Sequence, residues 1–446
     1  MEKNPIAFSL PRYDYYKSSG REFLGDIPND WSVLRLKYAA KINPTLLISK
    51  DQMNSNASFL PMEAVSVSGR VNYEIQRPVT ELRQGFTSFK KNDVILAKIT
   101  PCFENGKGAL LDNMPTEIGF GSTEFHVIRA QYGFDPKFLY YLTKTNLFKQ
   151  LGEQLMTGSA GQKRVQTSFV SNYYFPRPAY QTQILISEYL RKKVEQIDEA
   201  IFIKEQQINL LKERGQIILQ NAVTQGLDPN VPMKNSGVNW IGSIPEHWEV
   251  RRSKFLFTQR KEKAWKDDVQ LSATQAYGVI PQEQYEQLTG KSVVKIQFHL
   301  DKRKHVEKDD FVISMRSFQG GLERAWSRGC IRSSYVILKA AEKIEPAFYG
   351  YLLKLPAYIK ALQQTASFIR DGQDLNFDNF SQVDLFIPPI NEQIEIAHYI
   401  GKFTESANEA VVLLEQQIEK LREYKTSLID STVTGKIKIT PEMVEG

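Results

Sequence analysis

The chain has 446 residues, which at about 150 residues per domain is enough for roughly three domains, each able to bury a core. Its hydrophobic content of 41% and its charged content of 24% are ordinary for a globular protein and exclude a wholly disordered chain. The 57 basic and 51 acidic residues leave a formal net charge of +6, which permits an anionic partner such as nucleic acid without requiring one.

Cysteine and histidine are too scarce and too scattered for several classes of site. The two cysteines, Cys102 and Cys330, lie far apart in the sequence, which excludes a disulfide framework and a cysteine-rich zinc site. The five histidines include no His-Glu-x-x-His pattern. No run approaches about 18 apolar residues, and the N-terminal segment lacks a basic-then-apolar signal pattern, so we expect a cytoplasmic protein without a membrane span.

The feature that organises the chain is a tandem repeat. Residues 24–31 (LGDIPNDW) return as residues 241–248 (IGSIPEHW), and residues 91–96 (KNDVIL) return as KDDFVI at the same offset of 217. A second match aligns residues 183–224 with residues 393–434 at an offset of 210, with 16 identities in 42 positions. This similarity is far above chance, and we infer a duplication whose second copy is shorter in the region between the two matches.

Each copy begins with a globular module of mixed secondary structure. Short β-rich runs lie among Gly, Pro, Ser and Asn breaks, and they predict strands at residues 93–98, 124–129, 310–315 and 335–338. Helices are expected after Asp135-Pro136 and after Glu345-Pro346, because proline suits the first turn of a helix. The expected fold class is therefore α+β, with two mixed α/β modules.

Each module is followed by a long segment with a helical pattern of apolar residues. Apolar side chains recur every three or four residues, with Glu, Gln and Lys between them, which is typical of a coiled-coil seam. The predicted seam residues are Leu190, Val194, Ile197, Ile201, Ile208, Leu211, Ile218, Ile400, Ala407, Val411, Leu414, Ile418, Leu421 and Leu428. Such a stripe usually packs against its own domain, but two segments of matched length, each preceded by a proline-rich strand, favour mutual pairing. We expect two long antiparallel helices of about 42 residues, roughly 63 Å each, that form an intramolecular coiled coil.

These patterns divide the chain into parts that repeat in order. The parts are a first module over residues 1–179, a helix over 180–224, a linker over 225–240, a second module over 241–390, a helix over 391–434 and a tail over 435–446. Residues 17–20 (KSSG) resemble the end of the linker at residues 234–237 (KNSG). The chain therefore reads as a circle cut once, and we expect a pseudo-two-fold arrangement with neighbouring termini.

The sequence carries no recognisable catalytic motif. It has no Gly-x-x-x-x-Gly-Lys-Ser/Thr loop for ATP phosphates and no Gly-x-Ser-x-Gly elbow. An adenine methyltransferase would be expected to carry an Asn/Asp-Pro-Pro-aromatic tetrapeptide, but Pro388-Pro389 lies between isoleucines. Residues 118–121 (IGFG) match a glycine-rich cofactor loop only weakly. We therefore expect no catalytic residue, no metal site and no cofactor in this chain.

Both modules carry polar and basic residues at corresponding places. Arg and Lys donate to guanine edges and neutralise phosphates, and Gln forms two hydrogen bonds with adenine. Simple solvation explains any one of these residues equally well, but their recurrence in both modules favours DNA binding by the group. The candidate DNA-binding residues are Lys98, Lys107, Ser122, Thr123, Gln162, Lys163, Arg164, Arg316, Gln319, Arg324, Arg332, Arg370 and Gln373.

Several segments together resemble one known family. Residues 24–31 and 241–248 are similar to the openings of target-recognition domains in the specificity subunit of type I restriction–modification enzymes. Residues 119–127 (GFGSTEFHV) and the proline-rich exit followed by residues 391–393 (NEQ) are similar as well, and the resemblance covers essentially the whole chain. The first exit departs from the pattern, because residues 179–183 (AYQTQ) lack the usual acidic-Gln pair.

The resemblance implies a subunit without an active site of its own. Each module would read one half of a bipartite site in double-stranded DNA, and the paired helices would set the spacer length and dock two methylation subunits. S-adenosylmethionine, ATP and Mg²⁺ would bind to partner subunits, which include two restriction subunits that act as translocase and nuclease. The loops of the two modules differ (KITP at residues 98–101, RSFQ at residues 316–319), so the half-sites should differ and the target should be asymmetric.

Two other functions remain open from the sequence. The first is a self-contained adenine-specific DNA methyltransferase with a recognition domain, which methyl transfer by the purified chain alone would support. The second is a two-module coiled-coil scaffold that is indifferent to DNA. Salt-dependent binding to duplex DNA distinguishes this scaffold from a DNA reader, because neutralising phosphates makes the affinity fall steeply with salt.

Overall fold

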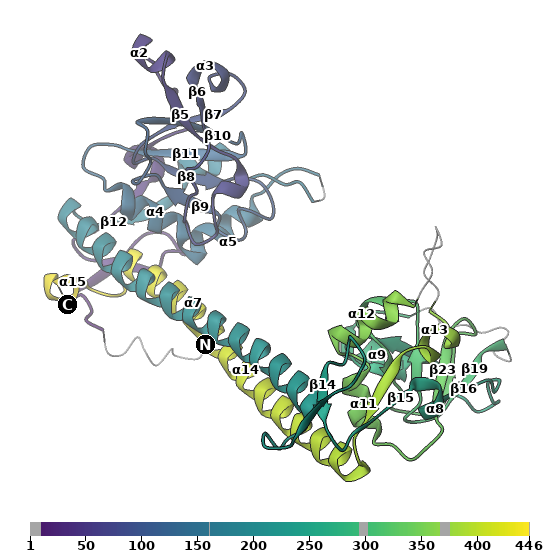
Figure 1. Cartoon of the computed structure of the whole chain (residues 1–446). Coiled ribbons are helices and arrows are strands. Elements are labelled where there is room, and N and C mark those ends of the chain that lie inside the picture. The colour runs from purple at the N-terminus through teal and green to yellow at the C-terminus, as the bar shows by residue number, and fades with distance from the viewer. Residues whose placement is uncertain (1–9, 160, 294–301, 366–374, 446) are drawn as a thin grey trace. The chain divides into compact units, whose positions relative to one another are not determined.

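The computed structural model describes residues 10–159, 161–293, 302–365 and 375–445 (Figure 1). The chain divides into two compact units. Unit 1 contains Met1–Glu205 and Glu415–Gly446, and unit 2 contains Gln206–Leu414. Each unit therefore combines one globular module with a part of each of two long helices, as the duplication implies.

The first module, in unit 1, is built from short strands in several small sheets. The strands are β1 (Tyr16–Ser18), β2 (Asp26–Pro28), β3 (Ser32–Arg35), β4 (Ala40–Ile42), β5 (Asn56–Leu60), β6 (Gln76–Pro78), β7 (Thr87–Lys90), β8 (Val94–Ala97), β9 (Gly108–Leu110), β10 (Ile118–Gly121), β11 (Phe125–Ala130) and β12 (Tyr174–Arg177). The central sheet has the order β4-β11-β8-β9, and another sheet has the order β6-β5-β10-β7. Smaller sheets pair β1 with β2 and β12 with β3. The two strands expected in this module are present as β8 and β11.

The helices of unit 1 cover the sheets and continue the chain. They are α1 (Leu36–Ala39), α2 (Lys50–Met53), a 3₁₀ helix (Met62–Ala64), α3 (Val79–Leu82), α4 (Pro136–Lys144), α5 (Asn146–Gln154), α6 (Thr167–Asn172) and α15 (Pro441–Glu445). Helix α4 begins where the Asp135-Pro136 pair predicted it. The Asp135 carboxylate accepts hydrogen bonds from the backbone N–H groups of Lys137 and Phe138, which satisfies two donors that the first turn leaves unpaired.

The second module, in unit 2, repeats most of this plan. Its strands are β13 (Met233–Asn235), β14 (Ser243–Pro245), β15 (Glu249–Arg252), β16 (Phe257–Arg260), β17 (Leu271–Thr274), β18 (Gly278–Pro281), β19 (Lys304–Val306), β20 (Phe311–Ile313), β21 (Glu323–Arg324), β22 (Gly329–Ile331), β23 (Val336–Ala340) and β24 (Asp384–Ile387). The central sheet β16-β23-β20-β21 corresponds to β4-β11-β8-β9, and it includes both expected strands, as β20 and β23. In place of the β6-β5-β10-β7 sheet, the described residues form the hairpin β17-β18 and the pair β19-β22.

The helices of unit 2 follow the same order around the central sheet. They are α8 (Ser253–Leu256), α9 (Gln282–Thr289), α10 (Ser317–Gly320), α11 (Pro346–Leu352), α12 (Pro356–Gln364) and α13 (Phe377–Ser381). Helix α11 starts after Glu345 as expected, and the Glu345 carboxylate accepts from the backbone N–H of Ala347 at 3.1 Å. A carboxylate cap followed by proline thus starts the corresponding helix in both modules.

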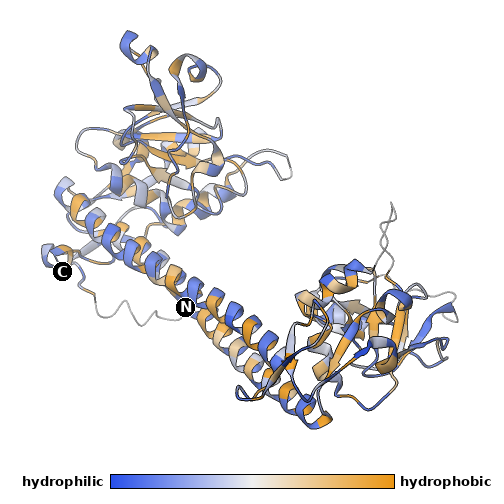
Figure 2. Cartoon of the chain, in the orientation of Figure 1, coloured by the Kyte–Doolittle hydropathy of each residue, from blue (hydrophilic) through white to orange (hydrophobic). Residues whose placement is uncertain are grey.

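Two long helices, α7 (Tyr180–Gln225, 46 residues) and α14 (Ile390–Val433, 44 residues), pair with each other inside each unit. In unit 1 the pairing is antiparallel, because Lys425 Nζ lies 2.7 Å from the carboxylate of Asp198 and Arg422 Nη2 lies 3.2 Å from that of Glu205. In unit 2, Gly215 of α7 faces the ring of Phe403 of α14. Figure 2 shows apolar and polar residues alternating along both helices, as the heptad pattern requires.

The seam positions selected from the sequence are all removed from solvent to some degree. Leu190, Ile197, Ile208, Ile400, Ile418 and Leu428 are buried. Half-buried are Val194, Ile201, Leu211, Ile218, Ala407, Val411, Leu414 and Leu421. Lys204 interrupts the apolar pattern, and its Nζ donates to Oε1 of Gln417 on the facing helix at 2.6 Å. Burial of the apolar stripe, rather than helix propensity alone, stabilises helices of this length.

In each unit, the end of a long helix packs against the repeated motif at the start of the module, which is residues 24–31 or 241–248. In unit 2, Gly226 follows α7 with a φ of +76° and lies against Trp248. In unit 1, Gly435 follows α14 with a φ of +75° and lies against Trp31. Both glycines occupy the left-handed conformation that commonly ends a helix. The tail after α14 thus packs against the start of the first module, as the linker after α7 packs against the start of the second module.

The tail also meets the beginning of the described chain. The backbone N–H of Lys438 donates to the carbonyl of Pro11 at 2.8 Å, and the Tyr16 hydroxyl donates to the carbonyl of Gly435 at 3.2 Å. The expectation that the two ends of the chain lie near each other is confirmed for these residues. No helix within the described ranges is long and apolar enough to cross a membrane.

Candidate nucleic-acid interface

Three segments that are distant in the sequence converge at one end of the central sheet in the first module. The backbone N–H of Lys98, directly after β8, donates to the carbonyl of Glu124 at 2.9 Å, and the N–H of Val165 donates to the carbonyl of Lys98 at 2.8 Å. The N–H of Thr100 donates to the carbonyl of Lys163 at 3.0 Å. The structure therefore brings the candidates Lys98, Ser122, Thr123, Gln162, Lys163 and Arg164 together.

An ion pair joins two of these segments. Nε and Nη2 of Arg164 donate to the Glu124 carboxylate, with the Nη2 contact at 2.8 Å. This hydrogen bonding and the positive charge of Arg164 lower the pKa of Glu124, and the charge of nearby Lys98 lowers it further. The carboxylate in turn raises the pKa of Arg164. Arg164 is thus held in a fixed orientation, because a bidentate pair constrains the planar guanidinium.

The remaining candidates of the first module differ in how free they are. Lys107 is half-buried, and its Nζ donates to the carbonyl of Met62 at 3.0 Å. Ser122 Oγ accepts from the backbone N–H of Glu124 at 3.2 Å. Thr123, Gln162 and Lys163 are exposed. The exposed side chains are the ones placed to meet a ligand in solution, whereas Lys107 and Ser122 are engaged in shaping the loops.

The second module places its candidates in corresponding loops. Arg316 and Gln319 are exposed after β20, and Arg332 is exposed after β22. Arg324 forms an ion pair with Asp309, with Nη2 2.6 Å from Oδ1, and its guanidinium lies 4.6 Å from the ring centre of Trp326. Arg370 and Gln373, the last two candidates, lie outside the residues that the structure describes.

The residue matches follow the two repeat offsets. Arg332 corresponds to Ser122 at the offset of 210, whereas Arg324 in β21 takes the place of Leu110 in β9, because the two pair with Phe311 and Val94. Strands β8 and β20 also correspond, since each pairs with the strand that follows its loops, β11 or β23. The two modules therefore present the same framework with different side chains at matching positions.

The family model of the type I restriction modification DNA specificity domain matches residues 28–213 and 245–420, which is well over half of the chain. The chain belongs to this family. Each matched range contains one module and the adjoining part of a long helix, so each repeat carries one specificity domain. This explains why the central sheets, the helix caps and the closing glycines all occur twice.

Individual relatives in the specificity family agree with this assignment. The chain is 32% identical over 228 residues to the type I restriction enzyme EcoAI specificity subunit of Escherichia coli, which covers 50% of this chain and 37% of that protein. It is 37% identical over 156 residues to the EcoEI specificity subunit of Escherichia coli, which covers 34% of this chain and 26% of that protein. The matched segments thus span well under half of the length of these two relatives.

Solved structures share the fold of the specificity subunit over nearly the whole chain. A chain from a study of complex assembly and conformational transition in a type I R-M system has a TM-score of 0.68 at 16% identity, covering 91% of this chain and 98% of that chain. The HsdS subunit from Thermoanaerobacter tengcongensis has a TM-score of 0.54 at 16% identity, covering 92% of this chain and 98% of that chain. The fold with two modules and long helices is thus a shared one.

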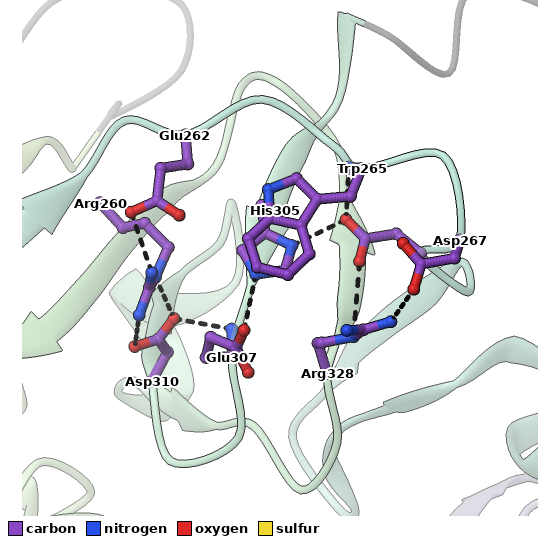
Figure 3. Close-up of polar contacts among 9 residues, drawn as sticks. Arg260, Glu262, Trp265, Asp267, His305, Glu307, Asp310 and Arg328 are labelled. Carbon is purple, nitrogen blue, oxygen red and sulfur yellow. Dashed lines mark hydrogen bonds and ion pairs between the residues drawn. The ribbon is translucent and has the colours of Figure 1, made fainter.

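The second specificity domain contains a buried polar cluster that the sequence interpretation did not select (Figure 3). The His305 ring is buried, with Nδ1 2.8 Å from Asp268 and Nε2 2.9 Å from Glu307. Burial alone would lower the pKa of His305, but its hydrogen bonds to the two carboxylates and their charges raise it. Trp265 stacks on the imidazole with ring centres 3.8 Å apart, and Arg328 lies beside Trp265.

The aromatic side chains beside these charges are partly open to solvent. Trp265 is 46% exposed and Trp326 is 52% exposed. Exposed aromatic rings next to cations are common in nucleic-acid sites, so the pattern of Trp beside Arg in residues 324–328 (RAWSR) was the signal available in the sequence. Within the described ranges of the chain, no group of three or more His, Cys, Asp and Glu could hold a metal ion.

Proposed function

We propose that the chain is the DNA-recognition subunit of a type I restriction–modification complex, in which each module reads one half of a bipartite site. The observation that carries the proposal is the repetition of one framework with different exposed side chains. The first module exposes Thr123, Gln162 and Lys163, whereas the second module exposes Arg316, Gln319 and Arg332. Two unlike readers require two unlike half-sites, so the target is an asymmetric sequence with an unread spacer.

We further propose that this subunit acts with partners that supply the chemistry. Two methylation subunits bring S-adenosylmethionine, and two restriction subunits bring ATP and Mg²⁺, because the sequence itself carries no phosphate-binding loop and no methyltransferase tetrapeptide. The complex works on DNA in the cytoplasm. Methyl transfer or cleavage by the purified chain alone would contradict this division of labour.

Exposed apolar side chains on the paired helices support a docking role. In unit 2, Leu210 and Ile217 lie seven residues apart on α7 and are 62% and 53% exposed, and Leu413 on α14 is 57% exposed. A spacing of seven residues places Leu210 and Ile217 on one face of the helix. We propose that methylation subunits cover these side chains, so that Leu210→Glu prevents co-purification with them while Asn209→Glu does not.

The test of recognition begins with the sequence that the complex modifies. Mapping methylated adenines in the host genome, with and without this gene, gives the bipartite target. Binding by the chain with its methylation subunits is then measured on duplexes in which one half or the other is scrambled. Loss of binding from either scrambled half is expected, and affinity should fall steeply with salt. Equal binding to all duplexes would overturn the proposal.

Single substitutions then assign the first module to a half-site. Lys163→Ala and Gln162→Ala are expected to weaken binding through one half only, whereas Lys91→Ala, at the opposite end of β8, removes a charge without affecting either half. Equal weakening through both halves would contradict the assignment. Insertion of four residues into α7 should lengthen the spacer of the methylated target, and an unchanged spacer would show that the helices do not set it.

A further inference from the structure

The duplication places a lysine at the same position in both modules. Residues 136–144 (PKFLYYLTK) align with residues 346–354 (PAFYGYLLK) at the offset of 210, so Lys144 corresponds to Lys354. Lys144 is the last residue of α4, and Lys354 follows α11 by two residues. Neither lysine was selected as a DNA contact, and both side chains turn back into their own module.

In the first module, the Lys144 ammonium joins two loops through backbone carbonyls. Its Nζ donates to the carbonyl of Gly106 at 2.7 Å and to that of Gly108 at 2.9 Å, and it lies 3.4 Å from the carbonyl of Val67. The three N–H donors of a lysine match three acceptors gathered at one point. Gly106 and Gly108 end the loop that follows β8, and Val67 belongs to the loop between β5 and β6.

In the second module, the Lys354 ammonium joins strand β21 to the turn between β17 and β18. Its Nζ lies 2.7 Å from Oε2 of the buried Glu323 and donates to the carbonyl of Gln275 at 3.1 Å. Glu323 in β21 corresponds to Ala109 in β9, because they pair with Val312 and Ile95, which match at the offset of 217. Gln275 lies in the turn between β17 and β18, and its Nε2 donates to the carbonyl of Arg316 at 3.2 Å. The acceptors differ between the modules, but each lysine joins the region at the start of β9 or β21 to a turn between two earlier strands.

The loops held in this way carry the candidate DNA-binding residues. Gly106 and Gly108 flank Lys107, and Glu323 immediately precedes Arg324. Through Gln275, Lys354 also reaches the backbone of Arg316. Each lysine therefore holds the backbone that carries Lys107 in the first module, or Arg324 and Arg316 in the second.

The surroundings of Lys144 disfavour a cation, which indicates that the lysine is kept for its contacts with the carbonyls. Burial, together with the charges of Lys425 on α14 and Lys149 on α5, lowers the pKa of Lys144 to about 7, while Asp198 on α7 acts in the opposite direction. An apolar side chain would fill this place without that cost. It would, however, leave converging carbonyls unpaired and the loop ends free to separate.

We propose that Lys144 and Lys354 are positioning residues for sequence reading, each holding the loops of its own module in register without contacting DNA. The proposal rests on the proposed function of the chain as a DNA reader. It extends that function by naming a pair of half-buried residues, outside the candidate DNA contacts, on which discrimination at each half-site depends.

The experiment uses the full chain with its methylation subunits and the duplexes with one half scrambled. Lys144→Met is expected to reduce discrimination between the intact and scrambled sequence roughly tenfold at one half-site. Lys354→Met is expected to do the same at the other half-site only. Lys137→Met is the matched control, because Lys137 lies on the same helix as Lys144 but its Nζ contacts Glu188 of α7 at 2.6 Å. It should leave discrimination at both half-sites unchanged.

The outcomes distinguish this proposal from the proposed DNA-recognition function on which it rests. Wild-type discrimination at both halves, retained by the Lys144→Met and Lys354→Met variants, would overturn the positioning role and leave the function intact. Loss at both halves from either variant would overturn it as well. If wild-type protein discriminates neither half, both proposals fail. If Lys144→Met lowers the unfolding temperature, Lys144→Arg is the second variant, because it keeps the charge and the donors. Lys144→Arg is expected to retain discrimination at both half-sites, and loss of discrimination in this variant would contradict the proposal.

Discussion

The indole Nε1 of Trp248 donates a hydrogen bond to Oε2 of Glu392 at 2.9 Å, which fastens the opening motif of the second module to the first turn of α14. The other oxygen of Glu392 lies 2.6 Å from Nε2 of His247. In the first module Thr182 stands in the place of Glu392, and the buried Nε1 of Trp31 has no hydrogen-bond partner among the described residues. The departure of the first exit from the family pattern therefore removes one contact while the fold remains.

Glu392→Leu is expected to destabilise unit 2 by about 1–3 kcal/mol, because the fully buried indole N–H of Trp248 would lose its acceptor. Amide hydrogen exchange, followed separately in the two units, measures this loss. Thr182→Val is the matched control in unit 1, where no such bond exists among the described residues, and it should change the stability by less than about 0.5 kcal/mol. A similar loss from both variants would show that the Trp–Glu bond is not the cause.

The Gln residue next to that position performs the same task in both units. Nε2 of Gln183 donates to the carbonyl of Pro178 at 3.1 Å, and its Oε1 accepts from the backbone N–H of Asp135 at 3.0 Å. Gln393 makes the corresponding bonds, to the carbonyl of Pro388 at 2.8 Å and from the N–H of Glu345 at 2.9 Å. Each amide thus ties the start of a long helix to the cap of α4 or α11.

Gln183→Leu should therefore destabilise unit 1 by about 2–4 kcal/mol, since one buried donor and one buried acceptor both lose their partner. Gln183→Glu should also be destabilising, because a carboxylate accepts from Asp135 but has no proton to donate to the carbonyl of Pro178. Urea unfolding of the full chain, with exchange protection at the start of α4, gives the measurement. Exposed Gln181→Leu serves as the control, and equal loss from Gln181→Leu would contradict the argument.

The repeat and the heptads were sufficient to predict the architecture from the sequence. Their periods come directly from geometry, since a helix that buries one face needs apolar residues every three or four positions. Proline after Asp135 and after Glu345 was enough to place α4 and α11. These features depend on neighbours in the sequence, which is why pattern reading finds them.

The ion-pair partners of individual charged residues could not be predicted from these patterns. Asp93 and Asp310 correspond in the repeat, and both are buried at the turn before the central strand. The partner of Asp93 is Arg129 in β11, with a contact of 2.7 Å, whereas the partner of Asp310 is Arg260 in β16, with a contact of 2.6 Å. The two arginines come from different strands, so the alignment of the copies does not predict them.

For the candidate interface, the structure brings the predicted segments of the first module together, but the sequence did not predict which cations are free. Arg164 is paired with Glu124, which lies 40 residues earlier, and Arg324 is paired with Asp309. These contacts depend on loop geometry that no local pattern encodes. Whether each candidate contacts DNA stays a prediction, and the exposed Gln162 and Lys163 are the first to test.

Two buried histidines give the units opposite responses to pH. In unit 2 the carboxylates of Asp268 and Glu307 raise the pKa of His305, so its contribution to stability is full below about pH 6.5 and is lost as pH rises through the higher folded value. In unit 1, burial and the charge of Lys98 lower the pKa of His126. Its contribution is present above about pH 6.5 and is lost as pH falls through the lower folded value.

Ring signals of the histidines in NMR spectra of the full chain measure both values directly, with His126→Gln and His305→Gln to assign them. His305 should titrate above the ordinary value for histidine and His126 below it. Hydrogen exchange should show unit 1, but not unit 2, losing protection on mild acidification. The reverse order of titration would contradict the contacts that surround the two rings.

Two helical glycines predict opposite effects of the same substitution. Gly215 lies inside α7, and an added methyl group would sit 3.6 Å from the ring of Phe403, which is ordinary contact. Gly215→Ala should therefore stabilise the helix pair in unit 2 by about 0.5–1 kcal/mol, because alanine loses less backbone freedom than glycine. A methyl group on Gly152 in α5 would overlap the ring of the buried Phe103, so Gly152→Ala should destabilise unit 1 by about 1–3 kcal/mol. Thermal unfolding with exchange in each unit measures both signs, and a loss of stability from Gly215→Ala would show that the seam has no room at that position.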